Sequence, residues 1–138
     1  MRVVGNGWDT VTLPASVELR GPTDYDGLFD LAAQAKICLD ASTYFDGAND
    51  RVFSYALNGA VCFTNASGYL RQVFGEDGGM RFFSMHNLSD LAEQVNSLLA
   101  RPAVLREAGE SAAVAVLRAH TWRHRVCNIL DAVRVAAE

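Results

Sequence analysis

The segment that decides the fold is Asp46–Phe74, which reads DGANDRVFSYALNGAVCFTNASGYLRQVF. After a polar loop, apolar residues recur at helical spacing over 49–57, and Asn58-Gly59 is a natural helix stop. The short apolar run Ala60–Phe63 comes next and is typical of a strand buried on both faces. Ser67–Phe74 then predicts a second helix. This order of helix, strand and helix indicates one repeat of a parallel α/β sheet.

The same pattern extends toward the N-terminus and one strand further along the chain. A helix whose apolar face includes Leu28 and Ala32 is expected to begin at Thr23 or Asp24. Further strands are predicted at Arg2–Val4, Val17–Leu19, Ile37–Leu39 and Met80–Phe83.

The remaining sequence is helical. Helices are expected over 88–99, 103–119 and 122–137, with a start signal at Asn87 and with Pro102 in the first turn of the second helix. We therefore predict an α/β fold with a single Rossmann-like, doubly wound parallel sheet of about five strands and a helical C-terminal tail. Residues 1–138 are expected to form one domain.

Composition excludes several classes of protein. Half of the 138 residues are hydrophobic and 20% are charged, which argues against disorder. A net charge of −4 argues against a general nucleic-acid binder. The sequence contains neither an apolar run long enough to span a membrane nor an N-terminal signal peptide, so we expect a cytoplasmic protein. Its three cysteines, an odd number, fit reduced thiols.

Ligands of open parallel sheets bind beyond the carboxyl ends of the strands. Three loops there are candidates, at Gly5–Asp9, Gly21–Tyr25 and Ser42–Asp50, and the first and the last carry the more specific signals. Gly5-Asn6-Gly7 either lets backbone approach a ligand or is only a tight turn. In Ser42–Arg51, Asn49 stands at a helix N-terminus, which attracts phosphate, and Arg51 opposes the helix dipole. Arg51 then binds a pyrophosphate, or Asn49 or Asp50 only caps the helix and Arg51 pairs with a surface carboxylate.

The sequence gives little support for a metal site or for a nucleophilic catalytic residue. His120 and His124 share a helix face, but no third ligand completes a zinc site. The cysteines at 38, 62 and 127 are interpreted as small buried hydrophobic residues. A receiver domain of the flavodoxin-like class is disfavoured because no acidic pair follows the first strand and the only lysine is Lys36.

The segment 46–74 also resembles the nucleotide-sugar-binding C-terminal half of GT-B, family-1-like glycosyltransferases, especially those related to spore-maturation glycosyltransferase-like proteins. Asp46-Gly47 matches the Glu-Gly start of the family's loop, Leu57–Ala60 its helix end, and Val61–Asn65 its strand. The later elements Asp90-Leu91-Ala92 and HTWRHR (120–125) are similar to the family's C-terminal helices, so the resemblance covers roughly residues 2 to 135.

The resemblance implies particular roles for these residues. Two family glutamates, eight positions apart, fall on Asp46 and Ser54, and the second usually holds the ribose of the donor. Arg51 falls where many relatives carry an arginine, and it is the candidate for the donor diphosphate. Gly5 and Gly7 match the glycine turn after the first strand. Such transferases use a nucleotide-sugar donor as substrate without an essential metal, so no cofactor is expected.

The resemblance also implies that the acceptor-binding N-terminal half, with its catalytic base, has no counterpart in this sequence. Catalytic residues are therefore unassigned, and catalysis by the chain alone is not expected. Two hypotheses stay open. The chain is a donor-binding domain for a nucleoside diphosphate sugar, alone or with a missing N-terminal domain, or it is a ligand-free interaction module that forms a homodimer.

Overall fold

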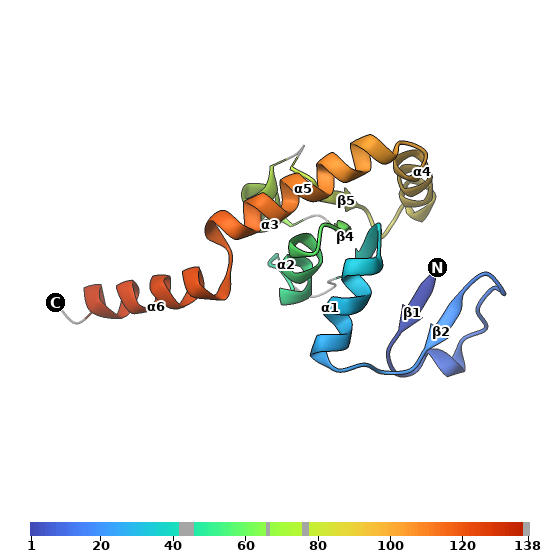
Figure 1. The fold of residues 1–138 in the computed structure, drawn as a ribbon, viewed down its shortest axis with the longest axis horizontal. Helices are drawn as coiled ribbons and strands as arrows, with labels where there is room; N and C mark the ends of the chain where they lie inside the picture. The colour runs from blue at the N-terminus through green and yellow to red at the C-terminus, as the bar shows by residue number, and fades with distance from the viewer. Residues whose placement is uncertain (42–45, 66, 76–77, 137–138) are drawn as a thin grey trace.

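The computed structural model describes residues 1–41, 46–65, 67–75 and 78–136. Strands and helices alternate up to the fifth strand, and the remainder is helical (Figure 1). The elements are β1 Arg2–Val4, the 3-10 turn η1 Trp8–Thr10, β2 Glu18–Arg20, α1 Tyr25–Gln34, β3 Ile37–Asp40, α2 Asp50–Leu57, β4 Val61–Asn65, α3 Gly68–Phe74, β5 Arg81–Phe83, α4 Leu88–Leu99, α5 Pro102–Ala119 and α6 Trp122–Ala136. The predicted α/β class is confirmed.

All strand pairs are parallel, but they form two sheets. The larger sheet has the order β3-β4-β5, with Asp40 opposite Thr64 in register. The smaller sheet consists of β1 and β2. In the described part of the chain no backbone pairing joins the two, so the single sheet expected from the sequence is divided after its second strand.

The division follows from where apolar surface is buried. Neither β1 nor β2 contains a buried residue, and Leu19 is 45% exposed. The small sheet is tied instead by polar contacts: Arg2 forms an ion pair with Glu18 at 2.9 Å and donates a hydrogen bond to Gln34 of α1 at 3.3 Å. Exposed contacts of this kind contribute little to stability, so the core that organises the fold belongs to β3-β4-β5.

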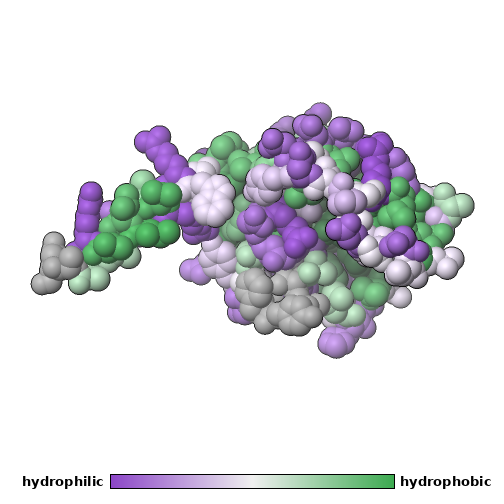
Figure 2. Space-filling model, turned by 90° about the horizontal axis from the view of Figure 1, so that it is seen from below, coloured by the Kyte–Doolittle hydropathy of each residue, from purple (hydrophilic) through white to green (hydrophobic). Residues whose placement is uncertain are grey.

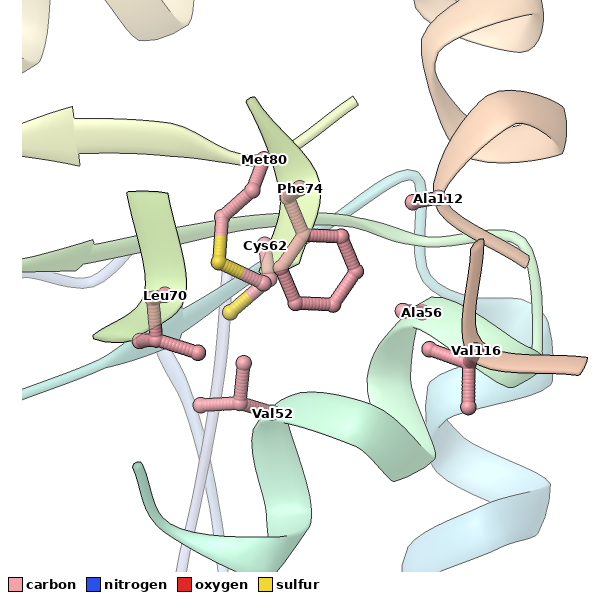
Figure 3. Close-up of a cluster of buried hydrophobic side chains, with 8 residues drawn as sticks. All are labelled: Val52, Ala56, Cys62, Leu70, Phe74, Met80, Ala112 and Val116. Atoms are coloured by element: carbon pink, nitrogen blue, oxygen red, sulfur yellow. The ribbon is translucent and has the colours of Figure 1, made fainter. Parts of the chain in front are cut away.

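The larger sheet is covered on both faces, as a doubly wound sheet requires. Successive residues of β4 point to opposite sides, so Phe63 and Cys62 belong to different cores. One core joins β4 to β5, α4 and α5 through Val61, Phe63, Phe83, Leu98 and Ala108. The other, shown in Figure 3, joins β4 to α2, α3 and α5 through Val52, Ala56, Cys62, Leu70, Phe74, Met80, Ala112 and Val116.

Side-chain caps fix the helix starts that the sequence predicted. The Asp24 carboxylate accepts a hydrogen bond from Gly27 N at 2.8 Å and begins α1. The Ser67 hydroxyl accepts one from Leu70 N and begins α3. Asn87 caps α4 in the same way. Each cap satisfies a backbone N–H that has no partner inside its helix.

The last helix, α6, differs from the others because none of its residues is buried. It extends away from the rest of the molecule in Figure 1. Its apolar side chains gather at the left of Figure 2, where they face solvent. The most exposed of the large ones are Trp122, Val126, Ile129, Leu130, Val133 and Val135.

Candidate functional site

The polar residues of the candidate site gather where β3 and β4 end and where α2 and α3 begin. Asp40 is the last residue of β3, and Ser67 caps α3 just after β4. The loop that leads into α2 is described from Asp46 onward, so residues 42–45 of the predicted segment lie outside the described residues. This is the sheet edge at which ligands of parallel α/β proteins bind.

Asp46 joins the loop before α2 to the first turn of α3. Its Oδ1 atom accepts a hydrogen bond from Gly68 N at 2.6 Å. A Cβ at Gly68 would lie 3.1 Å from Asp46 Oδ2, which is a tight contact. The carboxylate therefore satisfies a backbone donor at the start of α3, where a negative charge is favourable.

Arg51 lies in the first turn of α2 and pairs with a carboxylate, although not with the surface carboxylate considered from the sequence. Its Nε atom lies 3.2 Å from Oδ1 of Asp40. The Asp40 side chain is 2% exposed, whereas that of Arg51 is 52% exposed. The ion pair thus has a buried anionic end and a cationic end that reaches solvent.

Asn49 is the residue before α2, but its side chain does not cap the helix. Its Nδ2 atom donates to both oxygens of Asp40, at 3.1 and 3.0 Å. Asp50 provides a local acceptor instead, because its Oδ1 takes the hydrogen bond of Arg51 N at 2.8 Å. Asn49 and Arg51 thus both bind Asp40, which draws the start of α2 onto the end of β3.

Ser54 lies one turn further along α2 and is 7% exposed. Its hydroxyl donates to the Asp50 carbonyl oxygen at 3.4 Å, within the same helix. Only a small part of this side chain can be reached from solvent. A role for Ser54 toward a ribose stays a prediction.

The glycine turn lies on the smaller sheet. Gly5 and Gly7 have φ angles of 132° and 82°, which require glycine, and Gly5 N donates to Arg20 O at 3.4 Å. Among the described residues, no hydrogen bond or ion pair joins this turn to Asp46, Gly47, Asn49 or Arg51. The contacts therefore account for Gly5 and Gly7 as a turn, and their role toward a ligand stays a prediction.

Sequence reasoning missed Asp40 and a second cluster beside the site. In that cluster, Arg125 of α6 donates to the Tyr69 hydroxyl and lies 3.0 Å from Nδ1 of His120. The His120 ring stacks on Phe53 of α2 with 5.8 Å between ring centroids. Burial, followed by the nearby Arg125 charge, lowers the pKa of His120. The HTWRHR element therefore attaches the start of α6 to α2 and α3.

The sequence contains only weak indications that Asp40 and the histidines belong near the site. Asp40 ends the run ICLD, where a charged residue directly follows apolar strand residues. His120 and His124 share a helix spacing, yet Nδ1 of His124 lies 2.7 Å from the Thr121 hydroxyl and serves the start of α6. Within the described ranges, no group of three or more His, Cys, Asp or Glu residues is arranged to hold a metal ion.

The arrangement is suited to binding an anion. A half-exposed guanidinium is held at a fixed place in the first turn of α2, and the helix dipole adds partial positive charge. Arginine binds phosphate oxygens through several N–H donors in one plane. Together, the fold and the site define an α/β protein with a polar, arginine-bearing site at the carboxyl edge of a parallel sheet.

Comparison with known families identifies the family of the chain. The model of a family described as glycosyl transferase-like matches residues 1–131, and the chain belongs to that family. No individually curated protein matches the chain significantly. Among the described residues, no helix combines the length and the apolar character that a membrane span needs.

Proposed function

We propose that the chain is the donor-binding half of a GT-B glycosyltransferase and binds the diphosphate of a nucleoside diphosphate sugar at the carboxyl ends of β3 and β4. The observation that carries the proposal is the half-exposed Arg51 guanidinium, which the buried Asp40 holds in the first turn of α2. Membership of the glycosyl transferase-like family supports the same ligand class.

In this proposal the residues divide the work of binding. Arg51 binds the diphosphate oxygens, and the N-terminal end of α2 adds a favourable dipole. Asp46 and Asn49 keep the loop and the helix start in place through their contacts with Gly68 and Asp40. No metal is needed to offset the diphosphate charge in this scheme. In this proposal, transfer of the sugar also requires groups from a second domain that binds the acceptor.

Titration with UDP, GDP and ADP tests the proposal directly. We expect one of the three nucleotides to bind with a micromolar to millimolar Kd in calorimetry and to shift amide signals in 46–54. The variant Arg51→Ala should weaken binding about tenfold or more, because a charge-assisted contact is lost. Arg118→Ala, an exposed arginine of α5, is the matched control and should bind as the wild type does. No response to any nucleotide at millimolar concentration contradicts the proposal.

A second candidate function, self-association, is favoured by the exposed apolar side chains of α6. Trp122, Ile129 and Val133 are 74%, 62% and 61% exposed. Two copies can cover these apolar side chains by packing their α6 helices against each other in a two-fold dimer. Light scattering measures the mass, and Ile129→Asp should return a dimer to the monomer. A monomer at all concentrations, with a nucleotide response, leaves only the first function.

A further inference from the structure

Asp40 is a buried carboxylate whose neighbours come from the start of α2. The side chain is 2% exposed, and its recorded partners are the Asn49 amide, which reaches both oxygens, and Nε of Arg51. Burial of a charge is costly unless it is paired and hydrogen-bonded, and here both conditions are met. The Asp40 carboxylate thus occupies a buried position where an apolar side chain would be enough for packing alone.

The arrangement also gives up an ordinary helix cap. Asparagine at the position before a helix normally accepts a hydrogen bond from the first turn, which stabilises the helix. Asn49 turns its amide toward Asp40 instead. The contacts that start α2 are therefore organised around Asp40, and their common effect is to fix the place of Arg51.

Contact through Nε determines how Arg51 can meet a ligand. A guanidinium has five N–H donors, of which Nε carries one and the two terminal nitrogens carry four. Asp40 engages the Nε side, at 3.2 Å, while half of the side chain stays exposed. We infer that Asp40 is a positioning residue that directs the terminal nitrogens of Arg51 toward the diphosphate oxygens of the ligand. This inference rests on the proposed function.

Simple electrostatics predicts the opposite effect of Asp40. A carboxylate close to an anion site repels the anion, so removing its charge should tighten binding. Positioning predicts weaker binding, because Arg51 loses its fixed place and must be ordered when the ligand arrives. The sign of the change in affinity therefore separates the two roles.

The experiment is calorimetric titration of the full chain with UDP and with inorganic pyrophosphate. We expect Asp40→Asn to raise the Kd about tenfold for both probes, although it removes a negative charge. Asn49→Leu, which leaves the ion pair in place, should raise the Kd only about threefold. A Kd for Asp40→Asn equal to or below that of the wild type overturns the inference.

Two further measurements keep the test decisive. If Asp40→Asn fails to fold, Asp40→Glu replaces it: the charge is kept but the carboxylate is moved, so positioning predicts a Kd raised about tenfold, and wild-type or tighter affinity overturns the inference. NMR of the Arg51 Nε–H group needs no ligand: because Asp40 Oδ1 lies 3.2 Å from Nε, its signal should move when Asp40 is replaced, and an unmoved signal overturns the inference. If the wild type binds neither probe, the proposed function fails and the inference fails with it. If the wild type binds and the variants bind equally well, only the inference fails.

Discussion

Gly109 of α5 lies directly against the backbone of Gly59, in the turn between α2 and β4. A Cβ at Gly109 would lie 2.1 Å from the carbonyl oxygen of Gly59. Gly59 itself has a φ angle of 76°, which favours glycine. The two glycines therefore let α5 approach the turn that leads into the central strand.

Gly109→Ala should destabilise the protein because backbone cannot move away from the new methyl group as a side chain could. Alanine gains about 1 kcal/mol in a helix relative to glycine, but overpacking against backbone costs about 3 kcal/mol, so we expect a net loss of about 2 kcal/mol. Urea denaturation measures the free energy of unfolding. Gly21→Ala is the control, since no atom lies within 4 Å of its Cβ position. A stabilised Gly109→Ala would contradict the close contact.

Asp46→Ala removes the acceptor of the Gly68 N–H group at the start of α3. We expect a loss of about 1 kcal/mol, typical of a lost helix-terminal hydrogen bond, and a smaller loss for Asp46→Asn, which keeps an oxygen acceptor. Denaturation monitored by circular dichroism gives both values. Glu110→Ala is a matched control, because this carboxylate is exposed and its ion pair is long, at 3.9 Å. Equal losses for the three variants would show that the Asp46 contact is not special.

His120 should make stability depend on pH. Its pKa in the folded protein is lowered by burial and by Arg125, with a smaller effect of His124. The unfolded chain binds the proton more readily than the folded protein. The contribution of neutral His120 to the free energy of unfolding is therefore fully present above the ordinary pKa of histidine, about 6.5, and is lost as the pH falls through the lowered pKa.

The measurement for His120 compares unfolding at pH 7.5 and at pH 5. His120→Gln should lose less stability on acidification than the wild type, since its side chain does not titrate. His86→Gln, with an exposed histidine in the turn after β5, should behave as the wild type does. A variant His120→Gln with an unchanged pH profile would rule out this titration.

Thiol reactivity should distinguish the three cysteines. Burial raises the pKa of Cys38 to about 11 and that of Cys62 well above its usual value. At pH 8 only about 0.1% of Cys38 is then the reactive thiolate. The expectation of a buried residue is wrong for Cys127, which is exposed on α6 because no residue of that helix is buried.

A disulfide reagent at pH 8 should therefore modify one cysteine of the native protein rapidly and the other two only on unfolding. Cys127→Ser should remove the rapid phase. Rapid modification of two or three cysteines in the native wild type would mean that β3 and β4 open easily.

The sequence predicts the elements of this fold well because each has a local cause. Apolar runs define β3 and β4, and short polar side chains such as Asp24 and Ser67 begin helices where they were expected. The division of the sheet was not predictable from these signals. Arg2–Val4 has the composition of a strand, but its poor burial is a tertiary property, since it depends on which surfaces meet.

The site was predictable in part for the same reason. Asp46 stands in the loop before α2 and Arg51 in the first turn of that helix, and both lie near the carboxyl ends of β3 and β4, as expected, while their role toward a ligand stays a prediction. The partner of Arg51 was missed because Asp40 lies eleven positions earlier, on another element, and the burial of its side chain arises only from tertiary packing. The attachment of α6 through Arg125 and Tyr69 likewise joins residues far apart in sequence.

Helix α5 contributes to both cores of the larger sheet, with Ala108 in one and Ala112 and Val116 in the other. One helix therefore packs against both cores, so its displacement would expose apolar side chains on both faces of the sheet. The two faces should consequently melt together, in a single cooperative transition. A substitution that loosens the packing of α4 should then also destabilise the core beside α2, the helix of Arg51, on the opposite face of the sheet.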